Sequence, residues 1–329
     1  MTKTLRRMRR RVLAGIVASL ALASTTPFAQ GQYPAKPVRL IVPFPPGAGT
    51  DTVARYIAQK LTDALGQPVV VENRTRAGGA IGASEAAKSD ADGYTLLFVA
   101  SPFTTVAASN SHAGYDPISQ FVPVASIASG PLAFVVNVDV PARTLREFIA
   151  LARREPGRLN YGSAGTGSVN HLALELFNER TGAQVVHVPY RGIADATKDL
   201  LGGQIQAMTA SIPATLPQLA EHKVKVLAVT GKHRVAQMPG VPSWQEEGVA
   251  DAEVINYWGI VAPAGTPAAI VARLNNEIAR LLAQPDVVAR LTREGVEIIS
   301  GPPQRLGTLI ADDLGNWRRL IKDAKLGFD

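Results

Sequence analysis

The strongest constraint on the fold is a regular alternation of short β-branched runs and longer helical patterns, which begins at Val38. Residues 38–42 read Val-Arg-Leu-Ile-Val and predict a buried strand. Residues 50–65 predict a helix, because apolar side chains recur every four positions from Val53 to Leu65. Another strand is expected at 69–71. Strands and helices in this order predict an α/β fold whose mainly parallel sheets are flanked by helices.

The same alternation continues to the C-terminus. The helix expected at 144–154 has a capping signal, since Glu147 follows Thr144 by three residues. Further strands are predicted at residues 95–99, 132–138, 160–162, 185–188, 206–210, 225–230 and 258–262. Further helices are predicted at residues 78–89, 168–180, 194–201, 267–283, 285–294 and 303–323.

Residues 1–29 have the composition of a secretory signal peptide. Six bases and no acid precede an uncharged apolar run from Val12 to Ala23, which is too short for a membrane span of about 20 residues. Cleavage is expected after Ala23 or after Ala29. The run Arg9-Arg10-Arg11 also permits twin-arginine export beside general secretion. We therefore expect a protein of the periplasm.

Removal of this segment changes the charge of the protein. The full chain has 34 Lys and Arg against 27 Asp and Glu, and the six bases before residue 30 leave 28 against 27. A nearly neutral mature chain argues against nucleic-acid binding, which needs a basic face. The sequence has no cysteine, so a disulfide scaffold and a thiol nucleophile are excluded.

About 300 mature residues suggest two lobes with no flexible linker between them. We expect the chain to cross between lobes near Ser129-Gly130 and Thr230-Gly231, where glycine absorbs hinge rotation. Lobe one would then comprise residues 31–130 plus 232–329, and lobe two residues 131–231. The predicted fold class is therefore α/β with two lobes, each a mainly parallel sheet flanked by helices, on either side of a central cleft.

A Pro- and Gly-rich segment, the first loop (residues 43–51), joins the first strand to the first helix. Ligands of open α/β sheets bind at such strand ends, and helix N-termini attract anions. The residues expected to contact an anion are Pro46, Gly47, Ala48, Gly49, Thr50 and Asp51. A phosphate loop of Walker type is excluded, because no lysine follows Gly49. A stiff turn without a ligand remains an alternative.

The second loop (residues 163–170) has the same position relative to its strand and helix. Its candidate contacts are Ser163, Gly165, Thr166, Gly167, Ser168 and Asn170. A dinucleotide fingerprint fails, because Asn170 stands where that motif needs Gly or Ala. Two such loops, one in each lobe, suggest two jaws that close on a ligand with negative charge at each end.

Other candidates lie at strand ends. Tyr190 and Arg191 could offer a hydroxyl and a guanidinium, and arginine suits carboxylates. A solvated loop residue or a brace between lobes is the alternative for Arg191. Ser101 ends a predicted strand and could line the rim. Asn256, Tyr257 and Trp258 are weaker candidates, and burial in the core is the simpler account of the two aromatic residues.

Signatures of catalysis are missing from the sequence. The five histidines show no metal-ligand spacing, and no G-x-S-x-G motif occurs. We therefore expect no catalytic residue, metal or cofactor. A periplasmic enzyme that uses the same cleft remains an alternative.

The chain resembles the Bug (Bordetella uptake gene) family of extracytoplasmic receptors for tripartite tricarboxylate transporters. The resemblance covers nearly the whole mature chain. Its motifs include Pro46-Gly47-Ala48-Gly49-Thr50-Asp51, Val69-Val70-Val71-Glu72-Asn73-Arg74, Asp92-Gly93-Tyr94-Thr95, Val188-Pro189-Tyr190-Arg191-Gly192 and Ala262-Pro263-Ala264-Gly265-Thr266-Pro267.

The resemblance implies a two-lobe periplasmic binding protein of class II type, and we expect it to be a monomer. It implies that backbone amides of the first and second loops hold a small carboxylated metabolite, and that membrane transporter subunits are the partners. A receptor that feeds a sensor kinase is equally compatible. Two departures from the family pattern are Thr75-Arg76, where Pro-Gly is usual, and Thr209-Ala210, where Phe-Asp is common. Loss of that acid argues against an amino-acid ligand.

Overall fold

The computed structural model describes residues 33–47, 49–293 and 295–327. The predicted signal peptide lies outside the described residues. The chain divides into two units, Met1–Ala35 and Lys36–Asp329, and every described helix and strand belongs to the second unit. None of the described helices combines the length and the apolar character that crossing a membrane requires.

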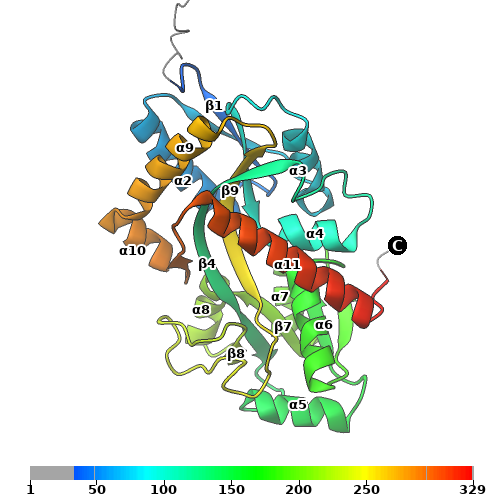
Figure 1. Cartoon of the computed structure of the whole chain (residues 1–329). Coiled ribbons are helices and arrows are strands. Elements are labelled where there is room, and N and C mark those ends of the chain that lie inside the picture. Colours follow the sequence, from blue (N-terminus) through cyan, green and yellow to red (C-terminus); the bar gives the residue numbers. More distant parts are fainter. Residues whose placement is uncertain (1–32, 48, 294, 328–329) are drawn as a thin grey trace, which may run out of the picture. The chain divides into compact units, whose positions relative to one another are not determined.

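The strands form two halves, and the first half contains β2 (Val69–Asn73), β1 (Val38–Val42), β3 (Thr95–Ala100), β9 (Ile255–Pro263) and the beginning of β4 (Phe121–Asn137). Its first three strands are parallel, and its last two are antiparallel to their neighbours. β1 lies between β2 and β3, β9 pairs with β3, and β4 follows β9. Figure 1 shows the long strands β4 and β9 side by side.

β4 also belongs to the second half. It pairs with β9 as far as Pro131, and from Leu132 onward it pairs with β7 (Ala207–Ser211). The rest of the second half consists of β8 (Val224–Val229), which pairs with β4, and the parallel strands β5 (Asn160–Ser163) and β6 (Val186–Pro189) beyond β7. One continuous strand therefore holds the two halves in register. A two-residue strand, β10 (Glu297–Ile298), pairs with the first half of β4.

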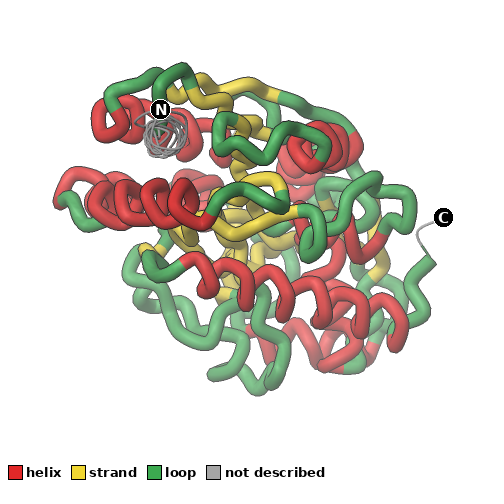
Figure 2. The backbone as a smooth tube through the Cα atoms, turned by 45° about the horizontal axis from the view of Figure 1, so that its top comes forward, coloured by secondary structure: helices red, strands yellow, loops and turns green. Residues whose placement is uncertain are grey.

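The helices lie on both sides of these strands (Figure 2). α11 (Pro303–Asp323) packs against both α4 (Pro102–Ser109) and β4. The other helices are α2 (Gly49–Leu65), η1 (Ala77–Gly79), α3 (Ala80–Ala87), α5 (Leu145–Arg154), α6 (Val169–Thr181), α7 (Ile193–Leu201), α8 (Ile212–Ala220), α9 (Ala268–Leu282) and α10 (Pro285–Arg293).

An aromatic cluster forms the core around the second half of β4. The ring of Phe134 lies 5.2 Å from that of Phe148, 5.0 Å from Phe177 and 6.4 Å from Trp244, measured between centroids. All four side chains are buried. Trp244 belongs to the segment between Thr230 and β9, so this segment contributes to the same core as β4 and α6. The residue ranges of the two lobes stay a prediction.

The predicted α/β class is confirmed, and most predicted elements agree with the structure within a few residues. The sheets are less parallel than predicted, because β4 and β9 pair with all of their neighbours in the antiparallel sense. Thr144 caps α5 as expected, because its side chain accepts the Glu147 N–H. The features that were not predicted include α4, α8, β10 and the first half of β4. Prolines explain two of these failures, since Pro217 lies inside α8 and Pro123 lies inside β4.

Replacement of Phe134 by alanine tests the aromatic core. Because the buried ring contacts three other aromatic side chains, we expect the free energy of unfolding to fall by about 3–5 kcal/mol. Chemical denaturation measures the effect, with Val138→Ala as a control at an exposed position. A loss below about 1 kcal/mol for Phe134→Ala would contradict this assignment of the core.

Candidate functional site

A buried carboxylate shapes the first loop. The Asp51 side chain is only 1% exposed and accepts hydrogen bonds from Gly47 N (2.8 Å), Arg55 Nε (2.9 Å) and Asn73 Nδ2 (2.7 Å). Burial alone would raise the pKa of Asp51, but the bonds from Asn73, Gly47 and Arg55 outweigh it and lower the pKa. Asp51 is therefore an ionised acceptor that folds the loop back onto the start of α2.

Two further bonds fix the first loop to neighbouring strands. Asn73, the last residue of β2, donates to the Phe44 carbonyl at 2.9 Å. The indole N–H of Trp258 in β9 donates to Thr50 Oγ1 at 3.2 Å. Trp258 is buried, as the simpler account of this residue predicted, and it also orients a hydroxyl at the N-terminus of α2.

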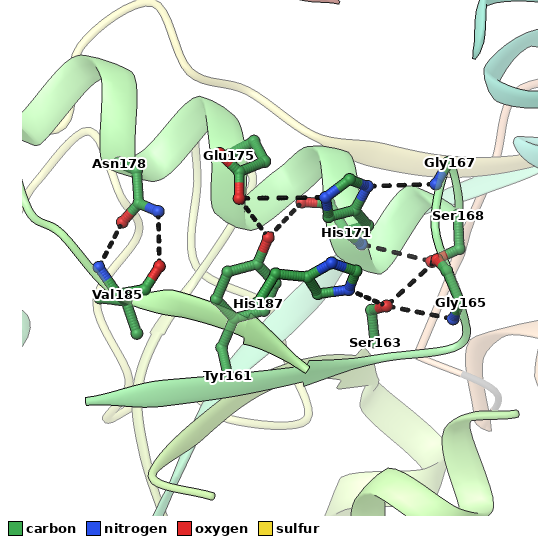
Figure 3. Close-up of polar contacts among 10 residues, drawn as sticks. All are labelled: Tyr161, Ser163, Gly165, Gly167, Ser168, His171, Glu175, Asn178, Val185 and His187. Carbon is green, nitrogen blue, oxygen red and sulfur yellow. Dashed lines mark hydrogen bonds and ion pairs between the residues drawn. The ribbon is translucent and has the colours of Figure 1, made fainter. Parts of the chain in front are cut away.

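The second loop is also folded back onto acceptors from its own neighbourhood (Figure 3). Gly165 N–H donates to Ser163 Oγ and Gly167 N–H donates to His171 Nδ1, both at 3.1 Å. Ser168 Oγ donates to the Gly165 carbonyl at 2.6 Å and accepts the His171 N–H as the N-cap of α6. The backbone φ angles of Gly165 and Gly167 are +114° and +77°, so glycine is needed for the shape of the loop.

These bonds change the expected role of the glycines. The amides of Gly47, Gly165 and Gly167 were expected to face a ligand, but each donates to a side chain of its own loop or of the helix that follows. Each of these backbone donors therefore has an internal partner, whether the glycine is exposed, as Gly47 is, or buried, as Gly167 is. The glycines therefore define the curvature of the loops.

Behind the second loop lies a cluster of four polar side chains, which we call the histidine cluster: Tyr161, His171, Glu175 and His187. Tyr161 and His187 are in register on the parallel strands β5 and β6, so they emerge on one face. His171 and Glu175 are four residues apart on α6, and their side chains point towards Tyr161 and His187 (Figure 3).

The contacts within the histidine cluster are close. The two imidazole rings stack with centroids 3.9 Å apart, and the Tyr161 ring lies 5.0 Å from that of His187. The Tyr161 hydroxyl donates to Glu175 Oε1 at 2.5 Å, and His187 Nε2 lies 2.6 Å from Ser163 Oγ. The cluster thus reaches the second loop at both Ser163 and Gly167.

Burial keeps the two imidazole rings of the histidine cluster uncharged at neutral pH. Burial and the neighbouring His187 lower the pKa of His171 to about 4, and burial lowers the pKa of His187 to about 4. Burial raises the pKa values of Glu175 and Tyr161. Because His171 Nδ1 accepts an N–H, its ring proton must lie on Nε2, which is 3.9 Å from Glu175 Oε1.

The other predicted contacts divide into buried and exposed residues. Ser101 is buried and donates to the Ile255 carbonyl, and Asn170 is buried and donates to the Thr209 carbonyl at 2.7 Å. Tyr190 donates to Asp199 at 2.7 Å. Pro46, Gly47, Thr166 and Arg191 are exposed, Gly49 is the first residue of α2, and Ala48 lies outside the described residues.

The structure brings the second loop against α4. A Cβ atom added to Gly167 would lie 2.5 Å from the hydroxyl of Ser109, the last residue of α4. A Cβ atom on Gly79 would lie 3.2 Å from Pro43 Cβ at the start of the first loop. Among the residues that the structure describes, no hydrogen bond or ion pair joins the two loops directly. Their pairing across a cleft stays a prediction.

The histidine cluster was not predicted from the sequence, because the five histidines show no metal-ligand spacing. The available signals were the spacing of His171 and Glu175 on one helix and the position of His187 two residues before Pro189. No group of three or more potential metal ligands occurs within the described part of the chain.

The fold and loops define the class of protein. Two α/β sheet halves joined through a shared strand, with polar strand-to-helix loops, are the architecture of a periplasmic solute-binding protein. Residues 53–326 match the tripartite tricarboxylate transporter family receptor. The chain belongs to this family, and the resemblance to Bug proteins is confirmed.

The similarity extends over almost the entire chain. BugT of Bordetella pertussis is 36% identical over 316 residues, which are 95% of this chain and 97% of BugT. Rpa4515 of R. palustris, solved with adipate, is 34% identical with a TM-score of 0.79 and covers 89% of this chain and 98% of its own. MatC (Rpa3494) from Rhodopseudomonas palustris, solved with bound malate, is 32% identical with a TM-score of 0.77, and the match covers 88% of this chain and 100% of MatC.

Replacement of Asp51 by alanine tests the structure of the first loop. It leaves three donors without their acceptor, so we expect the free energy of unfolding to fall by about 2–3 kcal/mol. Asp63→Ala, at an exposed position of the same helix, should change stability by less than about 0.5 kcal/mol. Equal effects of the two substitutions in chemical denaturation would argue against the bracing role.

The histidine cluster predicts a loss of stability in acid. Both folded-state pKa values lie near 4, below the ordinary 6.5, so between these values the unfolded chain binds protons that the folded protein does not. Stability should be highest above pH 6.5 and fall towards pH 4, by at most about 1.4 kcal/mol per pH unit for each histidine. The double variant His171→Asn, His187→Gln should show a shallower decline in urea unfolding. A decline as steep as that of the wild type would contradict the assignment.

Proposed function

We propose that this chain is an extracytoplasmic receptor that captures a small carboxylated metabolite in a cleft between two lobes and delivers it to a tripartite tricarboxylate-type membrane transporter. In this proposal the protein is exported to the periplasm, loses residues 1–29 and acts as a monomer. Family membership and the carboxylate-bound relatives support the proposal.

The observation that carries the proposal is the position of each loop at a helix N-terminus and the internal hydrogen bonds that fix its shape. Each follows a parallel strand and opens a helix, α2 or α6, whose N-terminus favours negative charge. Each loop is held from behind by buried hydrogen bonds, so its shape is set before a ligand arrives. Preorganised loops of this kind reduce the entropic cost of binding.

Exposed residues at these loops are the proposed ligand contacts. Thr166 lies at the tip of the second loop, and Arg191 follows the neighbouring strand β6. Within the described parts of the chain, the Arg191 guanidinium has no hydrogen-bond or ion-pair partner. An unpaired guanidinium suits a carboxylate. The buried predicted residues, Ser101 and Asp51 among them, would act by shaping the site.

We assign the ligand to the dicarboxylates of four to six carbons. The relatives were solved with malate and with adipate, and both molecules have a carboxylate at each end. Thr209 and Ala210 at the end of β7 offer no carboxylate for an ammonium group. The proposed ligand therefore lacks an amino group.

A panel of succinate, malate, adipate, citrate and glutamate tests the function. A bound acid should raise the free energy of unfolding by about 2.7 kcal/mol at a hundredfold excess over its Kd, whereas glutamate should have no effect. NMR spectra of the acid after incubation separate a receptor from an enzyme, because a receptor returns the acid unchanged. Stabilisation by glutamate alone, or conversion of an acid, would overturn the proposal.

Replacement of Arg191 by alanine tests the proposed contact. Loss of a charged hydrogen-bond donor should weaken binding of the best dicarboxylate by about tenfold to a hundredfold in calorimetric titration. Lys198→Ala removes an exposed cation from α7, the helix that follows Arg191, and should leave the affinity within about twofold. Similar affinities for the two variants would exclude a specific role for Arg191.

A further inference from the structure

The second loop is attached to the histidine cluster at two points with different chemistry. Gly167 N–H donates to His171 Nδ1, a nitrogen that accepts only while it carries no proton. Gly165 N–H donates to Ser163 Oγ, which lies 2.6 Å from His187 Nε2. Both rings are uncharged in this arrangement, and His171 is only 5% exposed.

Protonation affects the two attachments differently. If His187 gains a proton, its Nε2–H can donate to Ser163 Oγ, and the Ser163 hydroxyl can turn to the Gly165 carbonyl at 3.1 Å. Hydrogen bonding at this point is then preserved. If His171 gains a proton, its Nδ1–H and the Gly167 N–H face each other as two donors, and the bond that holds Gly167 is lost.

The surroundings of His171 contain few other charges. α6 packs against β5, β7 and α4, and neither β7 nor α4 has an ionisable side chain. The ionisable group on β5 is Tyr161, and those on α6 itself are Glu175, Glu179 and Arg180. Glu179 and Arg180 form an ion pair one turn beyond Glu175. Among the described residues, the ionisable groups with ring or ion-pair contacts to His171 are His187, Glu175 and Tyr161.

We propose that His171 is a positioning residue that holds the second loop in its ligand-binding shape only while its ring is uncharged, so that acidification releases the loop. The role rests on the proposed function, because it takes the second loop as part of the ligand site. A charged His187 ring, stacked 3.9 Å away, would oppose protonation of His171, so release of the loop needs stronger acid than a solitary histidine would need. Glu175 Oε1, 3.9 Å from His171 Nε2, is placed to receive the charged ring.

NMR on the ligand-free protein tests the proposal without any ligand. The amide signals of Gly165 and Gly167 and the imidazole nitrogen signals of His171 and His187 are followed from pH 7 to pH 3.5. We expect the Gly167 amide to shift with the same midpoint as His171, and His171 to show the Nε2–H tautomer at pH 7. A Gly167 amide that does not move with His171 would overturn the proposal.

Two substitutions separate the hydrogen bond from the ionisation. His171→Asn keeps an acceptor near the position of Nδ1 but cannot be protonated, so the Gly167 amide should lose its titration step. His171→Ala removes the acceptor, and the Gly167 amide should exchange with solvent at least about tenfold faster at pH 7. His222→Asn is the control, because His222 is exposed and its φ of 54° suits asparagine. An unchanged titration step in His171→Asn would contradict the proposal.

Affinity at pH 7 connects the loop to the ligand. For the tightest binder among succinate, malate, adipate and citrate, we expect His171→Ala to bind about tenfold more weakly and His171→Asn to stay within about threefold of the wild type. Unchanged affinity in folded His171→Ala would exclude a role in ligand binding. If the wild type binds none of the four acids, the proposed function fails, while the amide titration still decides whether His171 positions the loop.

Discussion

Backbone pairing along β4 is the constraint on which the rest of the structure depends. The strand bonds to β9 and β10 in its first half and to β7 and β8 in its second, so its amides and carbonyls are used on both edges. Each half then orders its own parallel strands, and these strands end in the two polar loops. A displacement along β4 would therefore alter the relative position of both loops, whereas a change in either loop leaves β4 intact.

The two loops solve the same physical problem with different groups. A tight turn at the end of a buried strand leaves amides that must find acceptors. The first loop uses the Asp51 carboxylate, whose pKa is lowered by its donors, and the second uses Ser163 and the neutral His171 ring. The carboxylate stays an acceptor over most of the pH range, but the imidazole does not. The two loops thus differ in their response to acid although their backbone roles are alike.

The strands and helices with strong periodicity were predictable from the sequence, and the placement of loops between them followed from chain order. Among the elements that were not predicted, α8 and the first half of β4 contain prolines that sequence rules treat as breaks. The role of the loop glycines was predicted only in part. Their positive φ angles follow from glycine itself, but which acceptor takes each N–H depends on residues brought in from β2, β6 and α6. Asn73 is 29 residues from its partner Phe44, and His187 is 24 residues from its partner Ser163.

A site held by backbone curvature and neutral side chains has a consequence for transport. A receptor must bind its ligand and then surrender it, so a cluster of fixed charges deep in the site would favour capture over release. In this chain the charged groups nearest the loops are either paired internally, as Asp51 is, or exposed, as Arg191 is. The two buried histidines behind the second loop are uncharged at neutral pH because burial lowers their pKa values. Under the proposed function, attraction for a carboxylate would come from the helix N-termini and the exposed Arg191 guanidinium, and solvent would screen both whenever water reaches them.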